Sequence, residues 1–305
     1  MIMKALGVLL IWMVLSVLHA SPVLAGPFHC TPQQIKNGTC AENPFPNYGQ
    51  VGNTTCSISP KGVCAAAEAI NSFTFLKNTY PKVYGSTSID TGPEKTSAAA
   101  ANDFASNGWT SGGTTYKGYY DRFNTDGPNK QYFDYLMTKE DWFQSFAPNT
   151  TRFDVRGKEA DLPKADQVNP NAAFLLQQIM DGEDVELFIQ STQDSTATKH
   201  AISLVGVSWT PSGKKDKGIN CRAPQTCAMD FQDPNMPAQE GGVPISLNNG
   251  ILSFDYMNAT WQIVAAFAES PKGSHKVPEP SSGLTFVVAL GALGLFIRRS
   301  GKLPA

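Results

Sequence analysis

Two apolar segments, one near each end, limit the part of this 305-residue chain that can form a globular core. The first extends from Ala5 to Leu18 and the second from Gly283 to Ile297. We predict that both are targeting segments and contribute nothing to the fold. The region between them, residues 26–270, is then expected to form the exported domain, and its length suits one large domain or two small ones.

The N-terminal segment has the organisation of a secretory signal peptide. Lys4 supplies the positive charge before the apolar run, and Val23 and Ala25 place small residues at positions −3 and −1 of a cleavage site. We therefore predict a signal peptide at residues 1–25, with cleavage after Ala20 as the second choice. An uncleaved anchor helix is the alternative, and the serine and proline that follow the run argue against it.

The C-terminal segment has three parts in a fixed order. Pro278, Glu279 and Pro280 precede the apolar run, and Arg298 and Arg299 follow it. At about 1.5 Å per residue, the run spans about 22 Å as a helix, less than the roughly 30 Å of a hydrocarbon core. Such a marginal transmembrane helix, with arginines on its cytoplasmic side, can hold the chain in the bilayer while an enzyme acts on it. An ordinary tail anchor that is never cut is the alternative.

This arrangement, at residues 277–305 after a polar linker at residues 271–276, resembles the PEP-CTERM sorting signal. The resemblance implies that signal peptidase and an exosortase process the chain, which crosses the inner membrane and is held there transiently by its C-terminal helix. It also implies a Gram-negative source and a final location in the cell envelope or extracellular biofilm matrix, where a peptide or a matrix polysaccharide is the expected partner. The net charge of −2 offers no basic surface for nucleic acid.

Apolar periodicity predicts that the middle region begins with helices and continues with strands. Helical stripes recur at three- and four-residue spacing, and runs rich in β-branched residues indicate strands. The expected helices cover residues 64–77, 98–104, 131–146 and 171–180, and the expected strands cover residues 185–190, 201–209, 228–231 and 261–268. Helices followed by strands favour an α+β fold.

The six cysteines fall into three local couples, and an oxidising location favours disulfides. The two couples predicted to be structural disulfides are Cys30–Cys40 and Cys221–Cys227. The third couple stays open, because Cys56 and Cys64 can form a disulfide or Cys64 can be a reactive thiol.

The sequence gives no signal for a cofactor. No histidine stands beside the Cys221–Cys227 couple, as a zinc site would require, and no glycine-rich phosphate loop is present. A small acidic group, formed by Glu183, Asp184 and Glu186, is expected to lie in solvent rather than to bind a metal. We therefore expect neither a metal nor a cofactor.

Four residues can together form a nucleophilic site. Cys64 begins a predicted helix, whose N-terminus would lower the pKa of a thiol, and His200 is the one histidine inside the predicted fold. Asp233 follows a predicted strand and can fix the imidazole tautomer, with Asn235 in reserve. We predict Cys64 as the nucleophile, His200 as the base and acid, and Asp233 as the orienting group. A histidine bonded into the sheet and an ordinary turn aspartate are the alternatives.

These positions resemble the papain-like cysteine peptidases, most closely their C39-like branch. The matching segments are the Cys64 helix with Asn71-Ser72-Phe73, the strand from His200 to Gly206, and Asp233-Pro234. The resemblance implies a papain-like α+β fold in which an N-terminal helix bearing Cys64 packs on an antiparallel sheet. It also implies hydrolysis of peptide bonds.

The glutamine of that family's oxyanion hole has a different spacing here. It usually stands about six residues before the nucleophile, where this chain has Ile58, whereas Gln50 lies fourteen residues before Cys64 and six before Cys56. Either Cys56 is the nucleophile or a loop is inserted after Gln50, and we favour the loop. Two functions stay open: a thiol hydrolase, and a catalytically silent surface or matrix protein, which a Cys56–Cys64 disulfide would favour.

Overall fold

The computed structural model describes residues 30, 32–41, 64–85, 100–126, 131–157, 168–193, 199–211, 219, 221–222, 225–236 and 240–273. Gly26–Lys272 forms one compact unit. The sequence predictions that lie outside the described residues are the signal peptide, Gln50, Cys56 and the sorting signal with Pro278, Glu279, Pro280, Arg298 and Arg299. Within the described part, no helix is long and apolar enough to cross a membrane.

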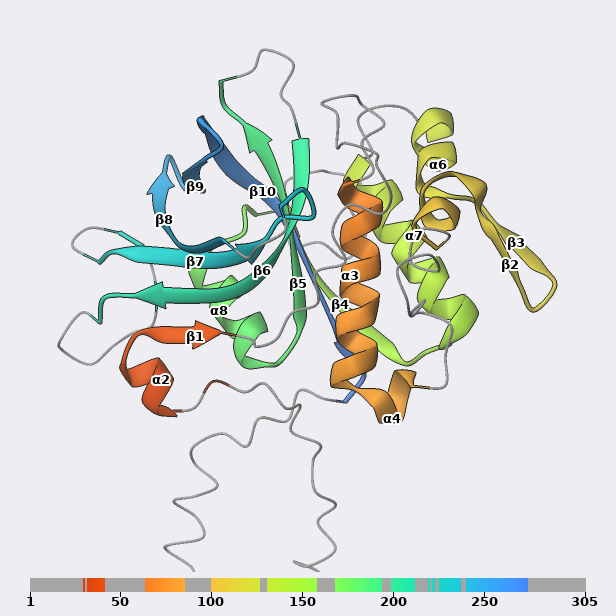
Figure 1. The fold of residues 1–305 in the computed structure, drawn as a ribbon, viewed down its shortest axis with the longest axis horizontal. Helices are drawn as coiled ribbons and strands as arrows, with labels where there is room; N and C mark the ends of the chain where they lie inside the picture. The colour runs from red at the N-terminus through yellow and green to blue at the C-terminus, as the bar shows by residue number, and fades with distance from the viewer. Residues whose placement is uncertain are drawn as a thin grey trace, which may run out of the picture. The chain divides into compact units, whose positions relative to one another are not determined.

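Eight strands form one antiparallel sheet. They are β1 (Thr39–Ala41), β4 (Thr151–Gly157), β5 (Asp184–Ser191), β6 (Lys199–Trp209), β7 (Cys227–Gln232), β8 (Glu240–Asn248), β9 (Ile251–Tyr256) and β10 (Ala259–Pro271). Neighbouring strands follow the order β6-β5-β10-β9-β8-β7, and β7 also pairs with β6, so these strands close into a six-stranded barrel. Outside this ring, β1 pairs with β6 and β4 pairs with β10 (Figure 1).

The prediction of a papain-like α+β fold is wrong, because the described part is mostly sheet and that sheet is a closed barrel. Closure depends on bulges, which bend a strand and increase its twist. The register shifts between Leu204 and Gly206 in β6, between Met229 and Phe231 in β7, and between Ile263 and Ala265 in β10. Local periodicity in the sequence reports neither these shifts nor the long-range pairings that they permit.

The helices and a small hairpin complete the fold. They are α2 (Pro32–Lys36), α3 (Cys64–Thr79), α4 (Pro81–Tyr84), the π-helix η1 (Asp103–Asn107), β2 (Trp109–Ser111), β3 (Thr114–Tyr116), α6 (Tyr119–Asp126), α7 (Gln131–Phe146) and α8 (Ala172–Met180). The helices expected at 64–77, 131–146 and 171–180 are thus α3, α7 and α8. Figure 1 shows α3, α4, α6 and α7 grouped beside the barrel, with α3 packed against β5 and β6.

Side chains of β5 alternate between two hydrophobic cores, as successive residues of a strand must. Val185, Leu187 and Ile189 belong to the core that the strands share with α8. Phe188 belongs to the other core, which α3 and α7 share with the sheet, and its ring packs on Tyr135 of α7. Even-numbered residues of β5 therefore face the layer of α3 and α7, which decides the surroundings of the acidic residues in this strand.

The two predicted structural disulfides are confirmed. Cys30–Cys40 ties the segment before α2 to β1, and Cys221–Cys227 ties the segment before β7 to that strand. Disulfides of this kind persist in oxidising compartments.

Candidate active site

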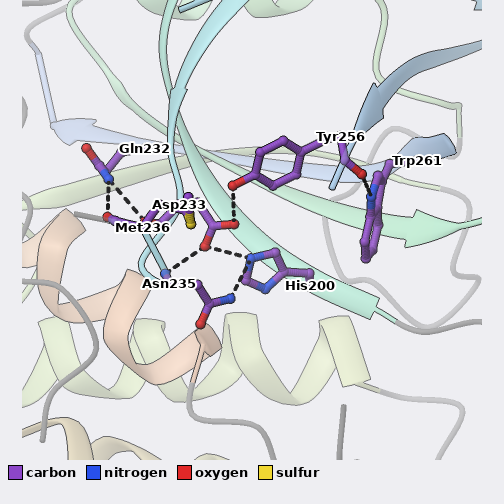
Figure 2. Close-up of polar contacts among 7 residues, drawn as sticks. All are labelled: His200, Gln232, Asp233, Asn235, Met236, Tyr256 and Trp261. Carbon is purple, nitrogen blue, oxygen red and sulfur yellow. Dashed lines mark hydrogen bonds and ion pairs between the residues drawn. The ribbon is translucent and has the colours of Figure 1, made fainter. Parts of the chain in front are cut away.

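His200 and Asp233 meet because β6 and β7 run antiparallel. His200 is the second residue of β6, Asp233 follows the last residue of β7, and Ser203 stands opposite Gln232 in the register of the pair. The start of β6 therefore lies alongside the residues just beyond β7. The imidazole Nε2 of His200 is 2.9 Å from Oδ1 of Asp233, with only 8% of the histidine side chain and none of the aspartate exposed (Figure 2).

The carboxylate of Asp233 is held by three donors. Besides His200, the backbone N–H of Asn235 donates to Oδ1 at 2.7 Å and the hydroxyl of Tyr256 donates to Oδ2 at 3.0 Å. Burial alone would raise the pKa of Asp233, but the hydrogen bond and charge of His200, with the bonds from Asn235 and Tyr256, hold it below its ordinary value. Asp233 is thus an ionised acceptor beside the imidazole.

This arrangement selects the working nitrogen of His200. An ionised carboxylate only accepts hydrogen bonds, so Nε2 carries the proton and Nδ1 is left as the basic nitrogen. The amide Nδ2 of Asn235 lies 3.3 Å from Nε2, while its Oδ1 has no hydrogen-bond partner in the described part. Rotating the amide group so that Oδ1 and Nδ2 exchange places would let Oδ1 also accept a hydrogen bond from the Nε2–H of His200. The site therefore presents an imidazole that is anchored on one side and can accept a proton on the other.

Cys64 is the first residue of α3 and is held in a disulfide. The disulfides Cys30–Cys40 and Cys221–Cys227 use four of the six cysteines, and Cys56 lies outside the described residues. α3 packs against β6, and the charge of Asp233 is among those acting on Glu68, one turn after Cys64. The start of α3 therefore faces the end of the barrel where His200 and Asp233 meet. No cysteine of the described part is free.

No model of a known protein family matches this chain, and a search of curated proteins finds no match. The interpretation of the site consequently depends on its geometry. The structure brings His200, Asp233 and Asn235 together and places Cys64 on a neighbouring helix, while Gln50 lies outside the described residues. Among the described residues, no group of histidine, cysteine, aspartate or glutamate side chains could hold a metal ion.

Sequence reasoning missed Tyr256 and Trp261, which complete the site. The indole Nε1 of Trp261 donates to the backbone carbonyl of Tyr256 at 3.0 Å, and its ring lies 6.3 Å from that of His200 (Figure 2). Tyr256 and Ala259 flank a two-residue turn, Met257-Asn258, in which both φ angles are positive, and Trp261 follows on β10. Such turns usually contain glycine or asparagine, so Asn258 was the only local signal of this hairpin.

A buried ionic cluster lies between α3, α7 and the sheet. The ammonium of Lys139 is 2.9 Å from Glu186 and 2.8 Å from Glu269, and all three side chains are completely buried. Lys139 also donates to Ser72 of α3 at 2.9 Å, and the hydroxyl of Tyr135 donates to Glu186 at 2.8 Å. These contacts join helices α3 and α7 to strands β5 and β10.

The acidic residues of this region do not lie in solvent, so that expectation is wrong. Glu183 is 1% exposed, and Asp184 and Glu186 are not exposed at all. Asp184 stands directly opposite Glu269 in the β5–β10 register, and neither carboxyl oxygen of Glu68 has a hydrogen-bond partner in the described part. The sequence shows the charges of β5 but not the helices that cover them.

One lysine cannot neutralise all of these carboxyl groups. Burial, followed by the charge of Glu186, raises the pKa of Asp184 from 3.8 to about 7. Burial also raises the pKa of Glu68 and of Glu269, and neighbouring carboxylates add to the shift. For Lys139, burial opposes the charged form, but the charges of Glu186 and Glu269 outweigh it and raise its pKa. The cluster therefore holds protons that an unfolded chain would release.

We expect the folded protein to lose stability as the pH rises from 5 to 8. A pKa that is raised by folding contributes stability that is complete below the unfolded value and is lost as the pH passes the folded value, here about 7 for Asp184. Each such group changes the free energy of unfolding by about 1.4 kcal/mol per pH unit within that window. Urea unfolding at a series of pH values measures this, and Asp184→Asn should flatten the dependence. A stability that rises from pH 5 to 8 would contradict it.

Proposed function

We propose that this protein is an exported thiol hydrolase held in a latent, oxidised form. In this proposal Cys64 is the nucleophile, His200 the base and acid, and Asp233 the group that orients His200. The observation that carries it is the 2.9 Å contact of His200 Nε2 with Asp233, on a strand against which α3 packs, because an imidazole anchored through Nε2 can take a proton at Nδ1.

The proposed chemistry begins with reduction of the disulfide at Cys64. A dithiol reductant supplies the electrons and becomes a disulfide itself, while Cys64 and its partner become thiols. Nδ1 of His200 then takes the thiol proton, and the N-terminus of α3 favours the resulting thiolate. An ionised Asp233 stabilises the imidazolium that forms.

The thiolate attacks the carbonyl carbon of a peptide or isopeptide bond. The bond between sulfur and carbon forms, the carbon–nitrogen bond breaks, and His200 gives its proton to the departing amine. Water then hydrolyses the thioester with His200 as the base, which releases the acid and restores the Cys64 thiol. Gln50 stays the proposed donor to the oxyanion, where one donor is worth about 2.7–4 kcal/mol.

We further propose that the chain reaches the envelope or matrix by the route that its ends suggest. The N-terminal segment has the features of a signal peptide, and the tail resembles the signal read by an exosortase. Five cysteines of the described part are disulfide-bonded, in Cys30–Cys40, in Cys221–Cys227 and at Cys64, and they support an oxidising location.

A permanently silent surface or matrix protein is the second candidate. The disulfide at Cys64 favours it, because the oxidised Cys64 is no nucleophile and no cysteine among the described residues is free. In that case the barrel would serve as a scaffold that binds a peptide or polysaccharide. The two candidates differ in what happens after reduction.

Cleavage of a generic peptide library separates them. We propose Cys56 as the partner of Cys64, so we expect the wild-type protein to cleave only after treatment with a dithiol reductant and Cys56→Ala to cleave without it. Cys64→Ala and His200→Ala should be inactive in both conditions. Peptide products would be identified by mass spectrometry. A folded, reduced wild type and a folded Cys56→Ala that both leave every peptide intact would support the silent protein instead.

A further inference from the structure

Tyr256 contacts the site from the far side of Asp233. It is the last residue of β9, and its hydroxyl is 3.0 Å from Oδ2, the carboxylate oxygen that neither His200 nor Asn235 uses. The phenol ring packs edge-on against Phe231 of β7, with centroids 5.0 Å apart and planes at 89°. The ring is thus fixed against the strand that leads into Asp233.

The carboxylate plane of an aspartate is only weakly fixed by its own torsion, because rotation about χ2 is broad. Here the two oxygens have different partners: Oδ1 accepts from His200 and from the backbone of Asn235, and Oδ2 accepts from Tyr256. Three donors in different directions leave one orientation of the group. Removing the Tyr256 donor leaves Oδ2 without a hydrogen-bond partner among the described residues, so the carboxylate can turn and lengthen its bond to Nε2.

Trp261 links the same hairpin to the histidine. Its Nε1 donates to the backbone carbonyl of Tyr256, and its ring lies beside the His200 ring with planes at 55°. The β9–β10 hairpin therefore reaches both members of the pair, the aspartate through Tyr256 and the imidazole through Trp261 (Figure 2).

We propose that Tyr256 is a positioning residue, which fixes the carboxylate of Asp233 and through it the orientation of His200. The effect on hydrolysis depends on the proposed function, but the effect on the His200–Asp233 hydrogen bond does not. The two can therefore be measured separately on the full chain.

Tyr256→Phe removes the hydroxyl and keeps the ring that packs on Phe231. In the oxidised protein, proton NMR follows the Nε2–H of His200 as a downfield signal whose exchange with water reports the strength of its hydrogen bond. We expect exchange to be at least tenfold faster in Tyr256→Phe than in the wild type. In the reduced protein we expect kcat for peptide cleavage to fall about tenfold with little change in KM.

Tyr116→Phe is the matched control, since Tyr116 stacks on Trp109 in the β2–β3 hairpin, away from the site. It should leave both measurements unchanged. Faster Nε2–H exchange in Tyr256→Phe supports the positioning role even if no form of the protein cleaves peptides, in which case only the hydrolase proposal fails. Unchanged exchange in Tyr256→Phe, with or without cleavage by the wild type, would overturn the positioning role.

Discussion

Replacing Lys139 with methionine is expected to lower the free energy of unfolding by about 3–5 kcal/mol at pH 8, because it leaves buried carboxylates without their counter-ion. Lys139 lies between Glu186 and Glu269, at 2.9 and 2.8 Å, and none of the three side chains is exposed. Methionine fills a similar volume, so the change tests the charge more than the packing. Urea unfolding of wild type and variant measures the difference.

The loss should be smaller at pH 5. Carboxyl groups with raised pKa values, such as Asp184, can take up protons there and no longer need the ammonium. Lys82→Met is the control, because Lys82 is exposed on α4 and its loss should change stability by less than about 0.5 kcal/mol. If Lys139→Met and Lys82→Met lowered the free energy of unfolding equally, the charge of Lys139 would not be what holds the helices to the sheet.

Asp233→Asn is expected to lower kcat/KM of the reduced protein by about 10²–10⁴-fold, the range in which an orienting carboxylate acts in related mechanisms. The negative charge that stabilises the imidazolium is lost. The asparagine amide also has only one accepting oxygen, so it cannot accept all three hydrogen bonds from His200, Asn235 and Tyr256 that the two carboxylate oxygens accept. The side chain keeps its size, so the barrel should still form. Cleavage kinetics on any peptide found in the library measures the loss.

Asp230→Asn provides the matched control. Asp230 lies three residues earlier, on β7, and accepts a hydrogen bond from the backbone of Gly242 at 2.7 Å, which asparagine can also accept. The same change of charge three residues away should leave cleavage within about twofold of wild type. If Asp230→Asn and Asp233→Asn lowered kcat/KM equally, the loss of activity would reflect the removal of any negative charge from this region. Asp233 would then have no specific role in the mechanism.

The sequence predicted well those features that depend on neighbours along the chain. Apolar stripes at helical spacing located α3, α7 and α8, and runs of β-branched residues located β5 and β6. The pairing of His200 with Asp233 was also predicted, from the resemblance to papain-like peptidases and from the position of Asp233 at the end of a strand, and the two side chains are in contact. Local periodicity carries the information on the helices and strands.

The features that were missed depend on long-range register. Whether the sheet closes is decided by the β6–β7 pairing and by bulges, and neither leaves a periodic signal. Asp184 and Glu186 look like surface residues until α3 and α7 are placed over β5. Tyr256 has no local mark of a site residue, since only the turn at Met257-Asn258 and the path of β9 bring its hydroxyl to Asp233.

The most direct test of the proposed function is the reactivity of Cys64 itself after mild reduction. The reduced protein is treated with iodoacetamide at pH 6, and alkylation is followed peptide by peptide in the mass spectrometer. An ordinary thiol with a pKa near 8.5 is almost wholly protonated at this pH, whereas an activated one is largely thiolate. Because nucleophilicity falls with the pKa, we expect Cys64 to react about tenfold faster than the cysteines of the other two disulfides. His200→Ala should abolish that difference. A Cys64 that reacts no faster than Cys30 or Cys221, with or without His200, would contradict the account. The protein would then be a disulfide-bonded barrel without catalytic activity.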